Sequence, residues 1–367
     1  MESPSLDGFR CLNLACPAYS QLGLGNIRLR KWYDTRSGRR RLLRCATCGR
    51  EFSELKGTAL WNTRLPHERA ADIMEHVTRS NSFKETAEFT HTHRTTVSRL
   101  VCIAGEHAQR VHDHHAQDLR VTSLQADERH GFVGRKDQPC WEATVIDPRS
   151  KFLVQNALGA RTTDLAVRLL FETRSRLHDP HGVVLFTDGW LPYDSLFPQV
   201  FGRPYQPKRQ GSRGRLPRLQ HRIPRTSGHV RIIKTYHGKR VTDIRIERAA
   251  GSQRRIDQEL EALGYTTPNT SAVERHNGTA RRMNPHQVRK SLAFARLPHV
   301  RQTVSDLVNA VYNYCRVHRS LRVKLDEPVG RRQYAQRTPA MAIGIADAVW
   351  SVLRLLRTVV LPTPCRS

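Results

Sequence analysis

Three acidic residues on separate segments of the chain have surroundings that suit metal-dependent chemistry on phosphodiesters. Asp127 follows the run 121–126, Asp188 follows closely on the apolar run 183–186, and Glu274 lies near the start of a helical stretch. Three carboxylates on separate elements can hold two divalent metal ions, and such a pair can cut and rejoin phosphodiesters. The pattern therefore predicts a site for two Mg²⁺ or Mn²⁺ ions, with catalytic and metal-binding acids at Asp127, Asp188 and Glu274.

Two other acids compete for the first of these positions. Glu128 would point to the opposite face from Asp127 in a continuing strand, because side chains alternate along a strand. Asp147 lies in the sequence Ile-Asp-Pro-Arg at 146–149, which is typical of a turn. We therefore expect Asp127 to be the ligand and Asp147 to belong to a hairpin.

Glu274 has an alternative role at the start of its own helix. Ser271 and Glu274 have the spacing of a capping box, in which the two side chains satisfy backbone N–H groups. Asn277 and Arg281 favour the functional role, since they share the helix face of Glu274 and carry groups suited to phosphate. We therefore predict that both contact DNA, and we keep helix capping as the alternative for Glu274.

The overall charge indicates a polyanionic partner. The 367 residues include 61 Lys and Arg against 33 Asp and Glu, for a net charge of +28 and a pI near 10.8. Such an excess favours binding to nucleic acid through phosphate contacts and counterion release. Double-stranded DNA is the expected partner, and an RNA-coating structural protein is the alternative that charge alone leaves open.

The chain has no features of a secreted or membrane-spanning protein. Its first residues, Met-Glu-Ser-Pro, lack the apolar core of a signal peptide. Uncharged runs are shorter than the ~18 residues that a membrane helix needs. We therefore expect a cytoplasmic, nucleoid-associated protein without a membrane partner, in which cysteines serve as metal ligands or core residues.

Four cysteines form two closely spaced pairs near the N-terminus. Cys11 and Cys16 are separated by four residues, and Cys45 and Cys48 by two. Four thiolates suit tetrahedral Zn²⁺, and a short segment with little apolar material needs such a staple. The spacing predicts a structural zinc ribbon, with four unrelated buried cysteines as the alternative.

The segment after the cysteines has the pattern of a helix-turn-helix. We expect helices at 68–77, from Ser82 as a cap with Glu85 three residues later, and at 93–107 with Thr92 as its cap. The first turns of the last helix enter the major groove in such motifs. The residues predicted to contact DNA there are Arg94, Thr95, Ser98 and Arg99. A plain three-helix packing unit with a solvated basic face is the alternative.

The elements that must position the first two acids alternate between strands and one helix. We expect a strand at 121–126, a hairpin of 132–134 with 141–146, a third strand at 152–158, an amphipathic helix at 164–177 and a buried strand at 183–186. This order is the plan of the ribonuclease H-like fold. In that fold, neighbouring strand ends bring two aspartates together and a later helix supplies the third acid.

A basic stretch separates the second acid from the third. Residues 203–255 hold 16 Lys and Arg but only two acids, and 229–233 with 240–246 alternate as in a hairpin. As an insertion after a strand, this stretch is expected to leave and return near the metal site and to clamp the DNA backbone there. The arginines assigned to this clamp are Arg213, Arg215, Arg218, Arg222 and Arg225. A solvated loop is the alternative.

These segments suggest a multidomain protein of the α+β and α/β classes. The expected units are a zinc ribbon at 1–60, a helix-turn-helix domain at 61–118 and a ribonuclease H-like catalytic domain at 119–320. The basic insertion lies inside the third unit. A tail at 321–367 is expected to end in an apolar helix at about 340–359.

Taken together, the motifs resemble DDE transposases of insertion sequences, of the insertion-sequence-one type in its longer single-chain form. The segments that carry the resemblance are Leu43-Arg-Cys-Ala-Thr-Cys-Gly-Arg-Glu-Phe52, Thr95-Thr-Val-Ser-Arg-Leu100, Ala126-Asp-Glu, Phe186-Thr-Asp-Gly-Trp190, Val273-Glu-Arg-His-Asn277, Ser291-Leu-Ala-Phe-Ala295 and Thr338-Pro-Ala-Met-Ala342.

The resemblance implies an enzyme that binds terminal inverted repeats and catalyses metal-dependent DNA strand cleavage and transfer. It places the metal-binding acids at Asp127, Asp188 and Glu274. It also implies a homo-oligomer, because two element ends must be held together. The alternative is a non-catalytic DNA-binding regulator derived from a decayed transposase.

Overall fold

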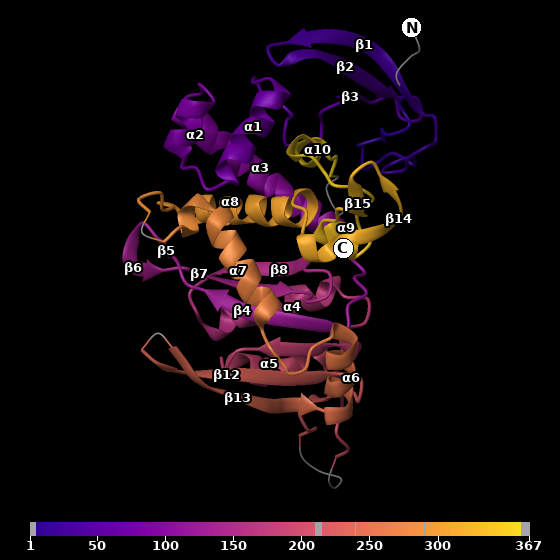
Figure 1. The fold of residues 1–367 in the computed structure, drawn as a ribbon. Coiled ribbons are helices and arrows are strands. Elements are labelled where there is room, and N and C mark those ends of the chain that lie inside the picture. The colour runs from indigo at the N-terminus through magenta and orange to yellow at the C-terminus, as the bar shows by residue number, and fades with distance from the viewer. Residues whose placement is uncertain (1–4, 210–214, 239, 290, 361–367) are drawn as a thin grey trace.

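A small antiparallel sheet forms the N-terminal part of the structure (Figure 1). The structure is a computed structural model and describes residues 5–209, 215–238, 240–289 and 291–360. Strands β1 (Ile27–Thr35), β2 (Gly38–Cys45) and β3 (Glu51–Ser53) pair in that order. Few apolar side chains pack here, and the cysteines are part of this small core.

Three helices follow, and the first two agree with the predicted pattern. They are α1 (His67–Val77), α2 (Phe83–Phe89) and α3 (Arg94–His115). The predicted capping box of α2 is confirmed: the backbone N–H of Glu85 donates to Ser82 Oγ at 3.2 Å, and the backbone N–H of Ser82 donates to Glu85 Oε2 at 2.7 Å. Reciprocal capping explains why so short a helix begins at a defined residue.

The third helix differs from the prediction at both ends. His93, rather than Thr92, caps α3, since its Nδ1 accepts the backbone N–H of Thr95. The helix also continues eight residues past the predicted end at 107. Its second half crosses α8 (Pro298–Ala310) so closely that a Cβ on Gly105 would lie 2.0 Å from the Thr303 carbonyl oxygen. We infer that packing against α8 stabilises the last turns of α3. The local sequence does not encode this contact, because α8 is far away in the chain.

The central sheet has six strands in the order β13-β12-β9-β4-β7-β8. Strands β4, β7 and β8 are antiparallel, whereas β9 and β12 run parallel to β4. The predicted strands β4, β7, β8 and β9 and the predicted helix α4 (Thr163–Arg176) are confirmed, with ends shifted by at most three residues. The strands are β4 (Ser123–Arg129), β7 (Trp141–Ile146), β8 (Leu153–Gly159), β9 (Val184–Thr187), β12 (Gly228–His237) and β13 (Arg240–Gly251).

Helices cover both faces of this sheet. Leu185 of β9 packs into the large core with α4 and α5 (Pro192–Phe201), whereas Val184 and Phe186 pack against α6 (Gln253–Leu263) on the other face. Helix α7 (Ser271–Met283) lies beside β4 and β7, on the face of α6. Because side chains alternate along β9, its successive residues pack against the helices of opposite faces, and the strand is buried on both sides.

Two expectations about the sheet are wrong. Strand β5 (Phe132–Val133) pairs with β6 (Arg135–Pro139) in a separate ribbon, because Gly134 adopts a left-handed conformation with φ of 71° and reverses the chain at once. Strand β7 pairs with β4 instead. The hairpin predicted in the basic stretch is confirmed as β12 and β13, but these strands extend the central sheet and are not an insertion outside it.

The C-terminal tail packs back against the segment that follows the small N-terminal sheet. The predicted long helix at 340–359 is wrong: α9 (Pro339–Ala342) and α10 (Val352–Arg357) are short, and Gly344 between them has φ of 89°. Strands β14 (Val323–Val329) and β15 (Arg332–Ala335) form a hairpin before them. Backbone bonds join the tail to the segment after the small sheet, from the Ala59 N–H to the Leu356 carbonyl and from the Val360 N–H to the Gly57 carbonyl.

Within the described residues, every helix is too short or too polar to cross a bilayer.

Candidate metal centre

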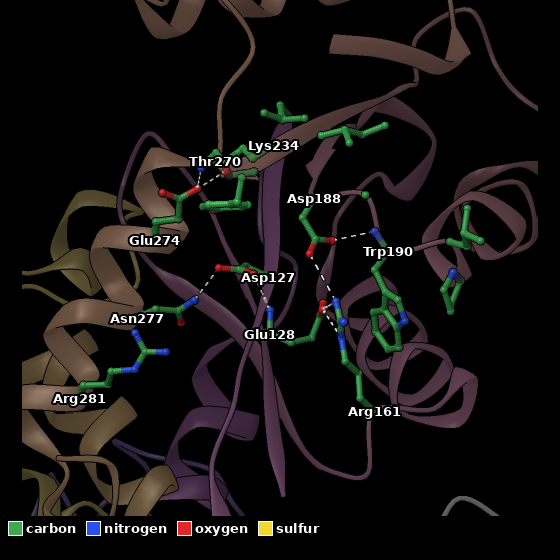
Figure 2. A pocket seen from close by; sticks show the side chains of 16 residues that line it. Asp127, Glu128, Arg161, Asp188, Trp190, Lys234, Thr270, Glu274, Asn277 and Arg281 are labelled. Carbon is green, nitrogen blue, oxygen red and sulfur yellow. Dashed lines mark hydrogen bonds and ion pairs between the residues drawn. The ribbon is translucent and has the colours of Figure 1, made fainter. Parts of the chain in front are cut away.

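The three predicted acids line one pocket of about 780 Å³ (Figure 2). Asp127 lies on β4, Asp188 directly after β9, and Glu274 in the first turn of α7. Strands β4 and β9 run parallel in a register that pairs Ala126 with Thr187. The next residue on each strand is therefore one of the two aspartates, and helix α7 brings the glutamate from the side.

Backbone and side-chain donors orient the two aspartates. Asp127 Oδ1 accepts the backbone N–H of Glu128 at 2.8 Å, and its Oδ2 accepts Asn277 Nδ2 at 2.8 Å. Asp188 Oδ1 accepts the backbone N–H of Trp190 at 3.0 Å. Figure 2 shows Asp127 between Asn277 and the Asp188 side of the pocket. The carboxylates are thus held in place before any ligand binds.

The most tightly clustered carboxylates in the pocket include that of Glu128, although strand alternation predicts that Glu128 points away from Asp127. One oxygen each of Asp127, Glu128 and Asp188 lie within 4.8 Å of one another. Strand β4 continues through Arg129, so Glu128 does turn away from Asp127 toward α5, where Tyr193 donates to it. Its long side chain still reaches the Asp188 side of the pocket, because a glutamate extends one methylene further than an aspartate.

Glu274 lies in the same pocket but is bound to other partners. Its Oε1 accepts Thr270 Oγ1 at 2.6 Å and also contacts Lys234 Nζ of β12. The capping-box alternative is not formed: Ser271 is inside the helix, and its hydroxyl donates to Asn269 Oδ1. The carboxylate is therefore free of a backbone-capping role, and an ion pair with Lys234 balances its charge.

Burial and mutual repulsion make the acidic group hold protons more tightly than usual. Burial, and then the neighbouring Asp188 carboxylate, raise the pKa of Asp127 to about 6. Burial and Asp188 also raise the pKa of Glu128 to about 7, against the opposing hydrogen bonds from Tyr193 and Arg161. Ionising both acids near neutral pH is costly unless a cation lies between them. A divalent ion would supply that cation, so the donor set fits a hard metal such as Mg²⁺ or Mn²⁺.

A buried hydrogen-bond chain supports Asp127 from behind. Arg129 Nη1 donates to Asn277 Oδ1 at 2.7 Å, and Arg129 Nη2 donates to Glu142 on β7. The Asn277 amide therefore has its oxygen toward Arg129 and its nitrogen toward Asp127. Both charged residues of this chain are buried. Burial of a paired arginine and glutamate fixes the position of Asn277.

The residues predicted to contact DNA lie in three places: the carboxylate pocket, helix α3 and the basic stretch. Asn277 and Arg281 line the carboxylate pocket. On the first turns of α3, Arg94, Thr95 and Arg99 are exposed and Ser98 is half-buried, and none of the four lines that pocket.

The described arginines of the predicted clamp lie at the opposite end of the central sheet from the carboxylates. Strand β12 starts at Gly228 beside Val184, the first residue of β9, whereas the carboxylates lie past the last residue of β9. The hydroxyls of Thr226 and Ser227 bond the carbonyl of His181, which precedes β9. The described residues of 203–225 therefore lie at the end of the strands opposite the pocket, because they follow α5 and not the end of β9.

Of the five arginines assigned to the clamp, Arg213 lies outside the described residues. The other four are in loops or in the short strand β11 (Gln220–Arg222), which pairs with β10 (Arg203–Tyr205). They are Arg215, Arg218, Arg222 and Arg225. Their contact with DNA remains a prediction, now separate from the pocket.

Several residues of the pocket were not singled out in the sequence. Arg161 follows β8 and reaches Glu128 and Asp188. Lys234 lies in a strand whose alternation gives no sign of a partner on α7. Tyr193 of α5 lies outside the pocket lining, but it is buried and donates to Glu128. Their roles depend on contacts between segments far apart in the chain.

The cysteine cluster has the geometry of a tetrahedral metal site. The Sγ atoms of Cys11, Cys16, Cys45 and Cys48 all lie within 4.8 Å of one another, with Cys11 and Cys48 at 3.7 Å and Cys16 and Cys45 at 4.0 Å. Four sulfurs about 2.3 Å from one Zn²⁺ would be about 3.8 Å apart.

One thiol of the cluster is already predisposed to bind a cation. Hydrogen bonds from the backbone of Arg50 and the side chain of Asn13 lower the pKa of Cys48 to about 6. The cluster is therefore compatible with zinc.

Comparison with known proteins does not identify a family. No protein-family model matches the chain, and no curated protein matches it in sequence. The function must therefore be inferred from the two clusters and from the charge of the chain.

Proposed function

We propose that this protein is a DDE-type transposase that binds the terminal inverted repeats of an insertion sequence and catalyses DNA strand cleavage and transfer. The observation that carries this proposal is the convergence of Asp127, Asp188 and Glu274 from two parallel strand ends and a facing helix. A net charge of +28 supports DNA as the substrate.

The sheet supports a ribonuclease H-like catalytic domain. Three antiparallel strands, β4, β7 and β8, precede helix α4, and β9 then returns parallel beside β4. Helix α7 supplies the third acid. The basic stretch contributes β12 and β13 to this domain.

The residues of the pocket have distinct tasks in the proposed reaction. The chemistry that a Mg²⁺ or Mn²⁺ pair supplies in such a site is activation of water or a 3′-hydroxyl and stabilisation of the leaving oxygen. Asp127 and Asp188 would hold the ions in orientations fixed by the Glu128 and Trp190 N–H groups. Glu274 completes the set once its carboxylate separates from Lys234, whose ammonium then becomes available to a phosphate.

The remaining parts position the DNA. Helices α1 to α3 act as a helix-turn-helix that recognises the repeat, and the four cysteines bind structural Zn²⁺ in a ribbon. Two or more copies assemble to hold both ends of the element, at the nucleoid in the cytoplasm. The residues that would contact the repeat from α3 are Arg94, Thr95, Ser98 and Arg99.

A strand-transfer assay tests this proposal. Labelled duplexes carrying the DNA that flanks the coding sequence are incubated with the protein and Mg²⁺, and cleaved and joined products are separated on denaturing gels. The proposal expects both products, and their loss on chelation. Binding without cutting would instead identify a regulator, and preference for RNA over duplex DNA at fixed salt would identify an RNA-binding protein.

A further inference from the structure

Arg161 packs against two tryptophan rings at the edge of the carboxylate pocket. Its guanidinium carbon is 5.0 Å from the ring centroid of Trp141 and 4.9 Å from that of Trp190. From there, Nε and Nη2 donate to Glu128 Oε2 at 3.2 and 2.9 Å, and Nη2 lies 3.4 Å from Asp188 Oδ2 (Figure 2). One guanidinium thus contacts two of the three acids whose oxygens cluster most tightly.

This arrangement differs from an ordinary ion pair. The Glu128 side chain is fully buried and already accepts a hydrogen bond from Tyr193, whereas a third of the Arg161 side chain, 34%, is exposed to the pocket region. Nη1 of Arg161 donates no hydrogen bond to any of the described residues. A guanidinium packed against two aromatic rings therefore has a donor left for a ligand.

A metal ion and Arg161 would compete for the same carboxylates. A divalent cation bound to Asp188 would repel a guanidinium only a few ångströms away, because like charges at such separations interact strongly even at high dielectric. The rings of Trp141 and Trp190 limit how far the guanidinium can withdraw. The anion that can take the place of Asp188 beside it is a phosphate group in the pocket, which arginine binds with two parallel hydrogen bonds.

We propose that Arg161 neutralises Glu128 and Asp188 in the free protein and binds a non-bridging phosphate oxygen of the DNA once metal and DNA occupy the pocket. The inference rests on the proposed function, since it takes the pocket to be a metal-dependent DNA site. It assigns to Arg161 a task that a purely structural arginine would not have. Removing its charge strengthens metal binding but slows the reaction of DNA.

The test measures both effects on the full chain, with the cysteine site loaded with zinc. Titration calorimetry with MnCl₂ in the absence of DNA gives the affinity of the pocket, after subtraction of the titration of Asp188→Ala. Nicking of supercoiled plasmid in Mn²⁺ gives the rate. We expect Arg161→Gln to bind Mn²⁺ about tenfold more tightly than the wild type. Its nicking rate should fall by about 10²-fold.

Two further variants make the result specific. Arg161→Lys keeps the charge but loses the planar fork, so it should bind Mn²⁺ like the wild type and nick DNA more slowly. Arg354→Gln is the matched control, since Arg354 also stacks on a tryptophan, Trp350, and pairs with an aspartate, Asp347, but on α10 outside the pocket. It should leave both measurements unchanged.

Each outcome decides the question. Mn²⁺ binding by Arg161→Gln that is weaker than or equal to that of the wild type overturns the inference, as does nicking at the wild-type rate. If Arg161→Gln does not fold, nicking by Arg161→Lys at the wild-type rate overturns the inference instead. A wild type whose Mn²⁺ titration matches that of Asp188→Ala refutes the proposed function itself, which separates the two failures.

Discussion

The cysteine cluster and the carboxylate cluster are both built from ligands for metal ions, but they are assembled in opposite ways. The cysteines come from one segment, 11–48, and their sulfurs are at tetrahedral spacing within a small core of their own. The carboxylates come from 127–274 and line an open pocket beside cationic side chains. A closed set holds a metal for folding, whereas an open set leaves room for a substrate.

The two clusters also differ in electrostatic cost. Burial and Asp188 raise the pKa of Asp127, and burial raises the pKa of the Cys11 thiol to about 12, whereas local hydrogen bonds lower the pKa of Cys48 to about 6. Arg161 and Lys234 offset the acidic charge without closing the pocket. We therefore propose that the first cluster stabilises the protein through a bound metal ion, whereas the second lowers stability where its acids are ionised without one.

The largest effect is expected at the cysteines. Replacing Cys45 by Ala should lower the zinc content from one ion per chain to none and unfold the N-terminal sheet, because structural zinc sites contribute on the order of 10 kcal/mol. Metal analysis of the purified full chain measures the stoichiometry. Cys140→Ala, outside the cluster, is the control and should keep the ion. Retention of one zinc by the Cys45 variant would remove the distinction between the clusters.

The next effect is on catalysis alone. Asp127→Ala, Asp188→Ala and Glu274→Gln should each reduce DNA cleavage by at least about 10³-fold while repeat binding stays near normal, since several kcal/mol of charge stabilisation is lost. Cleavage and electrophoretic mobility-shift assays on the same preparations measure the two properties. Glu128→Gln, the rival acid, should cost less. A larger loss for Glu128→Gln than for Glu274→Gln would make Glu128 the third ligand.

A smaller effect concerns stability and pH. Because the pKa of Asp127 is raised to about 6 in the fold, from an ordinary value of 3.8, its ionisation costs stability as pH rises through that interval. Asp127→Asn should therefore raise the free energy of unfolding at pH 7.5 without metal by about 1–3 kcal/mol. The gain should shrink toward pH 4. Urea denaturation at both pH values checks this.

The control for that measurement is an exposed acid on β14, Asp326. Its Asn variant should change stability by less than about 0.5 kcal/mol at either pH. A destabilised Asp127→Asn at pH 7.5 would show that the hydrogen bonds of Asp127 outweigh the repulsion, contrary to the contrast drawn between the clusters.

The smallest effect is expected at the ion pair between Lys234 and Glu274. Both side chains are partly exposed, so Lys234→Met should cost less than about 1 kcal/mol of stability. Cleavage should fall more than stability if the ammonium binds phosphate. Thermal unfolding and cleavage rates of this variant, beside Lys324→Met on β14 as the control, separate the two. A stability loss well above the expected value would make the pair structural.

Local patterns were sufficient for much of the fold. The short β-rich runs of β8 and β9, the periodicity of α4 and the reciprocal cap of Ser82 and Glu85 all operate within a few residues. The cysteine set was predictable from its spacing, because each pair lies within a few residues and the single hairpin of β1 and β2 separates the pairs. The proximity of the two aspartates was predictable too, since β4 and β9 run parallel with Ala126 beside Thr187, although β4 continues past Asp127.

Tertiary packing decided the rest. The length of α3 depends on its crossing with α8 at Gly105, and the place of β12 and β13 depends on pairing with β9. Arg161 and Lys234 enter the pocket only because strands and helices far apart in sequence meet there. Short-range propensities act over a few residues, whereas these contacts depend on which surfaces become buried together, and no local pattern in the chain encodes that.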